Sequence, residues 1–162
     1  MDSSSVPLPP SLGTAPQPLF VFDGVCVLCS RSVRFVLARE KNHELTFAPA
    51  QSALGQAIYQ ALGLSAEVYD TLIVLDQGRA YLKSAAVMQL ARRLRQPWRS
   101  LAVLEFLPRH WLDWLYDRVA RNRYRLFGRY DSCPLPDASL RARYVENVAT
   151  ASVQSNAPGT NL

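Results

Sequence analysis

The chain has 162 residues, a net charge of +5 and 49% hydrophobic residues, which fits one domain with a substantial core. Three cysteines are too few for the disulfide framework of a small secreted domain, so we expect a cytoplasmic protein. We expect neither a membrane span nor a secretory signal, because no apolar run is long enough. The charge is uneven, since residues 79–143 hold 14 Lys and Arg against 5 Asp and Glu. A basic half of this kind attracts acidic proteins, membrane surfaces and nucleic acids, so its charge alone does not choose among these partners.

The first structured stretch is expected after residues 1–18, which carry five prolines among Ser and Thr and are predicted to be a disordered leader. An apolar run at 19–22 has the composition of a buried strand, and Asp23-Gly24 is a typical turn. Cys26 and Cys29 follow with C-x-x-C spacing. They open a helix over about 27–40, because the apolar residues beyond them recur at helical spacing.

A C-x-x-C pair at the start of a helix predicts thiol-disulfide exchange. Unpaired backbone N–H groups at a helix N-terminus favour an anion, so a thiol there has a lower pKa than free cysteine. We expect Cys26 to be the attacking thiolate and Cys29 the deeper, less exposed thiol that resolves the mixed disulfide. Asp23, three residues before Cys26, is either a proton relay or a turn residue bonded to its own backbone.

The following elements complete an α/β domain over residues 19–96. The pattern predicts a strand at 45–48, a helix from Ser52 to Gly63, strands at 71–75 and 80–82, and a helix at 85–94. Because helices connect the first three strands, we expect those strands to be largely parallel and the last two to form an antiparallel hairpin. The cysteines then lie at the carboxyl edge of the central strands.

A basic helical extension packed on the core is predicted at 97–148, followed by a disordered tail at 149–162. From Trp111 the apolar residues recur at helical spacing, and Gly128 ends that helix. The spacing assigns the aromatic residues to a buried face and the arginines to a solvated one. We expect no nucleic-acid binding, because no recognised motif accompanies the charge. The aromatic residues are Trp111, Trp114, Tyr116 and Tyr124, and the arginines are Arg118, Arg121, Arg123 and Arg125.

The segment Asp23 to Cys29 resembles the signature of the DCC family of predicted thiol-disulfide oxidoreductases, which is named for its Asp and two Cys. The resemblance covers most of residues 19–148. It implies a thioredoxin-like sheet with flanking helices and a redox-active Cys26–Cys29 pair. We expect no bound cofactor or metal, because the electrons reside in the cysteine pair. The resemblance identifies neither the thiol or disulfide substrate nor the electron donor. The matching segments are Phe47-Ala48-Pro49, residues 81–86, residues 122–128 and Cys133-Pro134.

One departure concerns the residue before the third strand. Relatives of thioredoxin usually carry a cis-proline there, beside the cysteines, whereas this chain has Asp70-Thr71. The difference argues against binding of peptide substrates in the manner of thioredoxin.

Two other interpretations of the cysteines remain open. Cys26, Cys29 and Cys133, with or without a histidine, would suit a zinc-binding or interaction module, although Cys133 also fits a small buried hydrophobic residue. Alternatively, the chain is a membrane-surface adaptor with a vestigial redox pair.

Overall fold

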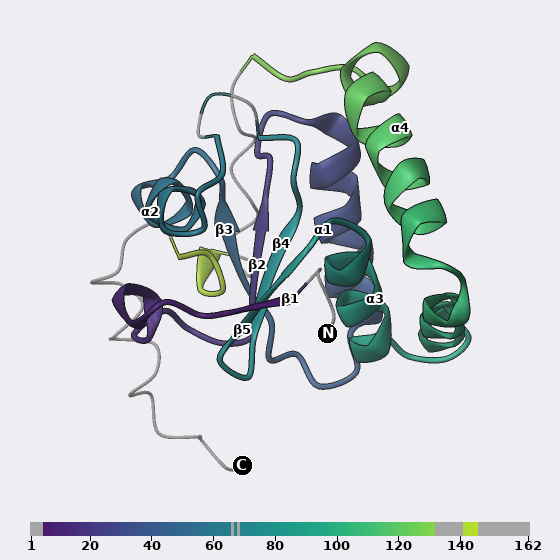
Figure 1. The fold of residues 1–162 in the computed structure, drawn as a ribbon, viewed down its shortest axis with the longest axis horizontal. Helices are drawn as coiled ribbons and strands as arrows, with labels where there is room; N and C mark the ends of the chain where they lie inside the picture. Colours follow the sequence, from purple (N-terminus) through teal and green to yellow (C-terminus); the bar gives the residue numbers. More distant parts are fainter. Residues whose placement is uncertain (1–4, 66, 68, 132–140, 146–162) are drawn as a thin grey trace.

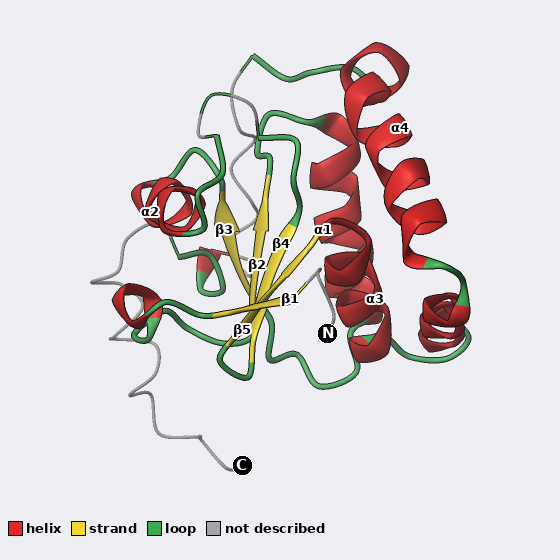
Figure 2. Cartoon of the chain, in the orientation of Figure 1, coloured by secondary structure: helices red, strands yellow, loops and turns green. Residues whose placement is uncertain are grey.

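The computed structural model describes residues 5–65, 67, 69–131 and 141–145. A five-stranded mixed sheet with the order β1-β5-β4-β2-β3 lies between two groups of helices (Figures 1 and 2), so the predicted α/β class is confirmed. The strands are β1 (Ser5–Pro7), β2 (Leu19–Phe22), β3 (Thr46–Pro49), β4 (Ile73–Asp76) and β5 (Arg79–Leu82). The α-helices are α1 (Val27–Arg39), α2 (Ala53–Ala61), α3 (Lys83–Arg93) and α4 (Arg109–Phe127), and the 3-10 helices are η1 (Pro10–Leu12) and η2 (Trp98–Phe106).

The central strands are buried on both faces, which explains their continuous apolar sequences. Alternate residues of β2 enter two different core clusters. Leu19 and Val21 pack with residues of η1 and α2 on one face. Phe20 and Phe22 pack with residues of α1 and α3 on the other. The sheet thus fixes the end of β2, where the C-x-x-C segment begins.

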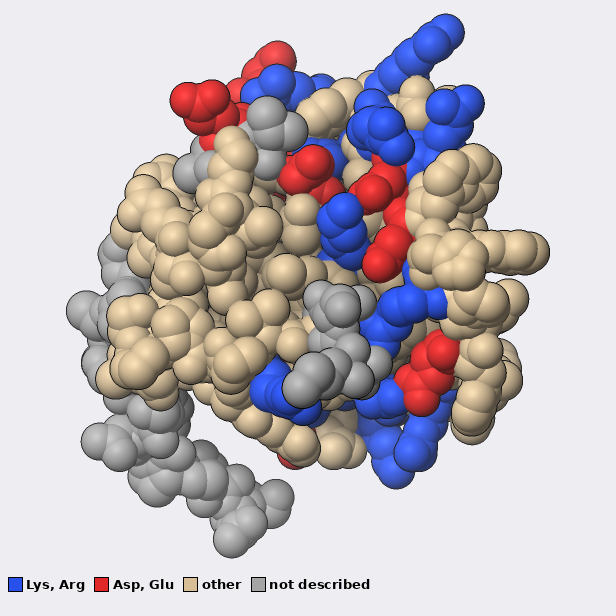
Figure 3. Space-filling view, viewed as in Figure 1, with Lys and Arg blue, Asp and Glu red and all other residues tan. Residues whose placement is uncertain are grey.

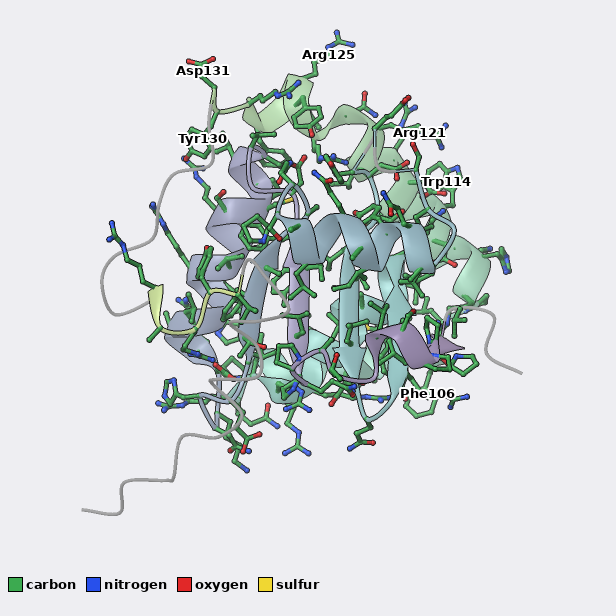
Figure 4. All side chains as sticks on the ribbon, turned by 90° about the vertical axis from the view of Figure 1, so that its left-hand side faces the viewer. Phe106, Trp114, Arg121, Arg125, Tyr130 and Asp131 are labelled. Atoms are coloured by element: carbon green, nitrogen blue, oxygen red, sulfur yellow. The ribbon has the colours of Figure 1, made fainter. Side chains whose placement is uncertain are left out.

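The expected parallel direction of the first three predicted strands is wrong for the third. β2 pairs with β3 in parallel, but β4 pairs with β2 antiparallel. Figure 1 shows α2 nearly end-on, and Figure 4, turned by 90°, shows it lying across the strands. Because α2 does not run back along the sheet, the chain enters β4 from the end at which β3 finished. The hairpin of β4 and β5 is antiparallel, as predicted.

The predicted disordered leader is also wrong for residues 5–18. β1 pairs antiparallel with β5, and Leu8 N donates to Gly78 O over 3.0 Å. Leu12 is only 4% exposed and belongs to the core cluster beside α2. Proline suits an edge strand, which needs fewer ladder hydrogen bonds. This segment can therefore pair with β5 although its sequence lacks the regular apolar pattern of a strand.

The part of the helical extension formed by η2 and α4 lies against α1 and α3, away from the sheet. Because it covers helices, only a narrow face of α4 turns inward. Tyr116 lies on that face and accepts a hydrogen bond from Leu72 N over 2.7 Å. Trp111 and Trp114 are 63% and 65% exposed, so their predicted burial is wrong.

Two further predictions concern the C-terminal part of the chain: the end of the helical extension at residue 148 and the disordered tail at 149–162. Residues 141–145 lie beside β3, where Phe47 N donates to Arg143 O and Val145 N donates to Phe47 O, each over 2.8 Å. Cys133 and the tail at 149–162 fall outside the described residues. Within the described part, no helix has the length and apolar character to span a membrane, and the cytoplasmic location stays a prediction.

Candidate active site

The two cysteines lie where the spacing predicts, at the N-terminus of α1. Cys26 is the N-cap residue, and its Sγ accepts a hydrogen bond from the backbone N of Cys29 over 3.5 Å. Cys29 lies in the first turn, and both residues are free thiols. One helical turn therefore brings the two side chains together, with the helix N-terminus directed at the first sulfur.

The expected order of exposure is reversed. Cys26 is 0% exposed, whereas Cys29 is half-buried. The chain after α4 covers Cys26, since Val27 N donates to Gly128 O over 3.5 Å and Tyr130 N donates to Val25 O over 2.8 Å. Gly128 allows this return with φ at +88°, a conformation that side chains disfavour.

The two sulfurs have opposite pKa shifts. The pKa of Cys26 is lowered to about 6, and the largest cause is a hydrogen bond from the Cys29 thiol, which acts against the opposing effect of burial. The Cys29 backbone N–H and the charge of Arg123 contribute to the lowering, while Asp23 opposes it. That same thiol hydrogen bond, together with burial, raises the pKa of Cys29. These opposite shifts favour a thiolate on Cys26 and a thiol on Cys29 at neutral pH.

Asp23 is held by four donors in the turn between β2 and α1. Its Oδ1 accepts from Val25 N over 3.1 Å and from Gln51 Nε2 over 2.7 Å. Its Oδ2 accepts from Arg123 Nη2 over 3.0 Å and from the Tyr124 hydroxyl. A carboxylate has about four acceptor positions, so these four donors leave no acceptor position of Asp23 free for a cysteine sulfur. The predicted hydrogen bond between Asp23 and the backbone of its own turn is present. The geometry suits a positioning residue better than a proton relay.

Arg123 is the site residue that sequence analysis misplaced on a solvated face. It is 4% exposed, and its Nη2 also donates to Tyr69 O over 2.7 Å. Burial lowers the pKa of Arg123, but hydrogen bonds with Tyr124 and Asp23 outweigh it and raise the pKa overall. Its position within residues 122–128, one of the segments of family resemblance, was the available signal.

A pocket of about 430 Å³ opens beside Cys29, between α1, α3, η2 and α4. Asp23 and Arg123 lie at its wall, and Cys26 does not line it. Most of the other lining side chains are apolar, including Leu28, Val36, Val87, Leu101, Leu112 and Val119.

The zinc interpretation gains no support from the part of the chain that the structure describes. Within it, no three His, Cys, Asp or Glu side chains group as metal ligands. Cys133, the third cysteine of that interpretation, lies outside the described residues.

Comparisons with known proteins show which family this chain resembles. The family described as DCC1-like thiol-disulfide oxidoreductase matches residues 20–129. An uncharacterized Bacillus subtilis protein, YuxK, is 34% identical over 130 residues, which cover 80% of this chain and 95% of that protein. A chloroplastic DCC family protein of Arabidopsis thaliana is 37% identical over 120 residues, covering 74% and 70% of the two chains. No solved structure matches. The chain belongs to the DCC1-like thiol-disulfide oxidoreductase family.

Proposed function

We propose that this protein exchanges disulfides through Cys26 and Cys29. The observation that carries the proposal is the hydrogen bond from Cys29 N to Cys26 Sγ at the N-terminus of α1. This geometry, with the lowered pKa of Cys26, supports a thiolate at neutral pH. Family membership supports a redox role for the pair.

The reaction has two balanced steps. The Cys26 thiolate attacks one sulfur of a substrate disulfide, and the other substrate sulfur leaves as a thiolate and takes up a proton. Cys29 then loses its proton and attacks Cys26 Sγ, releasing the second substrate thiolate. The substrate gains two electrons, and the protein becomes a Cys26–Cys29 disulfide. Because Cys26 is 0% exposed, the first step requires Gly128–Tyr130 to move aside.

Asp23 and Arg123 hold this site together in our proposal. Their ion pair joins the turn before Cys26 to α4, and the Arg123 charge favours the Cys26 thiolate. Asp23 acts as a positioning residue, because its oxygens already accept four hydrogen bonds.

Trapping of the mixed disulfide tests the proposal. A Cys29→Ser variant should retain a substrate thiol on Cys26 after treatment with a glutathione disulfide series, because resolution is blocked. Cys26→Ser should not, and Cys133→Ser is the matched control that should behave as wild type. Equal trapping in Cys26→Ser and Cys29→Ser, read by mass spectrometry, would refute the assignment of roles.

We also propose that the helical extension contacts an anionic membrane surface. The three acidic side chains of η2 and α4 turn toward α3, where Glu105 pairs with Arg92, Asp113 accepts from Ser84, and Asp117 pairs with Lys83 over 2.9 Å. The outer side is left with exposed apolar residues, including Phe106 at 85% and Trp114 at 65%. Figure 3 shows uncharged side chains forming the rim over α4, with Lys and Arg gathered near its upper end.

This pattern favours a membrane over an acidic protein, because Trp and Phe insert at a bilayer interface while arginines meet anionic headgroups. The full chain should float with phosphatidylglycerol vesicles and not with phosphatidylcholine vesicles. Trp111→Ser with Trp114→Ser should abolish flotation, and high salt should weaken it. Absence of flotation with anionic vesicles at low salt would contradict this proposal.

A further inference from the structure

The pocket beside Cys29 has the features of a small-molecule site. Its volume of about 430 Å³ lies within the range of about 300–1,000 Å³ that ligand pockets occupy. Side chains of α1, α3, η2 and α4 surround it, and Cys29 of the redox pair is one of its lining residues. Attack by Cys26 on an external disulfide makes no use of this pocket.

Most polar groups at the pocket wall already have partners, although the buried Nε of Arg123 has none. Asp23 and Arg123 pair with each other over 3.0 Å. Ser32 Oγ donates to Leu28 O over 2.8 Å, and the Tyr116 hydroxyl donates to Asp70 O over 3.2 Å. A charged ligand would lose hydration without gaining a free counter-charge from these groups. The pocket therefore favours an uncharged, apolar ligand.

The two sulfurs differ in access from this pocket. Cys29 lines it, whereas Cys26 does not and lies beneath the chain at Gly128–Tyr130. A ligand in the pocket therefore meets the Cys29 side of the pair without any movement of the covering segment. This arrangement offers a second approach to the redox pair.

We propose that the pocket binds a low-molecular-weight apolar thiol and that this thiol reduces the Cys26–Cys29 disulfide by attack on Cys29 Sγ. The inference rests on the proposed function, because it requires that disulfide. The substrate of this step is then small and apolar. This agrees with the absence of a proline before β4, which argues against binding of peptide substrates in the manner of thioredoxin.

The exchange balances for an apolar dithiol. One ligand thiolate forms a bond to Cys29 Sγ, the Cys26–Cys29 bond breaks, and Cys26 leaves as a thiolate. The second ligand thiol loses its proton and attacks the first ligand sulfur, which closes a cyclic disulfide and releases Cys29 to take up a proton. Two electrons pass from the ligand to the protein. The lowered pKa of Cys26 supports its role as the leaving group, since a thiol of lower pKa leaves faster.

The test compares two neutral dithiols, dihydrolipoamide and dithiothreitol, as reductants of the oxidised full-length protein. At equal thiolate concentration, and after correction for their rates with a small-molecule disulfide, dihydrolipoamide should react about tenfold faster, equivalent to about 1.4 kcal/mol. Val87→Asp places a charge on the pocket wall and should bring the ratio of the two rates close to one. Val6→Asp is the matched control, because Val6 and Val87 are both 39% exposed and Val6 does not line the pocket.

A binding measurement separates the pocket from the redox chemistry. Lipoamide should bind the Cys26→Ser/Cys29→Ser double variant in calorimetry, and a further Leu101→Asp change should abolish binding. Corrected rates that are equal for the two dithiols, or absent lipoamide binding, would overturn the inference while leaving the proposed exchange through Cys26 and Cys29 intact. If no Cys26–Cys29 disulfide forms, the proposed function itself fails, and this inference fails with it.

Discussion

Replacement of Arg123 by Met tests whether the buried ion pair organises the site. The side chains of Arg123 and Asp23 are 5% and 1% exposed. Removing one partner of such a pair costs about 3–5 kcal/mol, because the other charge stays buried. Gln51, Tyr124 and Val25 still donate to Asp23, so we expect the lower end, about 3 kcal/mol.

Urea unfolding of the reduced protein at neutral pH measures this loss. Arg121→Met is the matched control on α4, because Arg121 is exposed and should change the unfolding free energy by less than about 0.5 kcal/mol. In Asp23→Asn/Arg123→Met the two losses should fall short of additivity by about 1–3 kcal/mol. A loss below about 1 kcal/mol for Arg123→Met, or additive behaviour of the pair, would refute the reasoning.

Three further predictions concern the surroundings of the thiolate. The pKa of Cys26 falls from 9.0 to about 6 on folding, so its thiolate stabilises the fold above the unfolded pKa. The stability difference between reduced wild type and Cys26→Ser should therefore decline as pH falls from about 9 to about 6; a difference independent of pH would contradict the shift. Gln51→Leu removes the acceptor of Gly24 N and a donor to Asp23 and should cost about 1–3 kcal/mol in urea unfolding, whereas a change near zero would show that water replaces it. Gly128→Ala forces a side chain into a backbone with φ at +88° and should speed alkylation of Cys26 by loosening its cover; an unchanged rate would show that another segment controls access.

Local patterns predicted the part of the site that is local in sequence. The strand, the Asp23-Gly24 turn and the helix that begins after Cys26 are adjacent, so composition and spacing sufficed to place both sulfurs at a helix N-terminus. The exposure of those sulfurs was not predictable in this way. Gly128 and its neighbours cover Cys26 from about one hundred residues away, and no periodicity encodes that contact.

The incorrect predictions share a physical origin in tertiary contacts. Arg123 pairs with Asp23 across a sequence separation of 100 residues, so helical spacing alone gave it a solvated face. Trp114 lies on α4, which packs on other helices. This packing leaves a wider part of α4 exposed than packing on a sheet would, and Trp114 lies on the exposed part. The direction of β4 depends on the orientation of α2 in space, and the hydrophobic pattern of α2 does not specify that orientation.

A redox titration of the Cys26–Cys29 pair tests the central claim most directly. The protein is equilibrated in a glutathione or dithiothreitol series, the free thiols are alkylated, and mass spectrometry identifies which residues are bridged. We predict a reversible two-electron transition between roughly −300 and −120 mV, with a disulfide that joins these two residues. Failure of that disulfide to form across the series, or a bridge that requires Cys133 instead, would contradict the account.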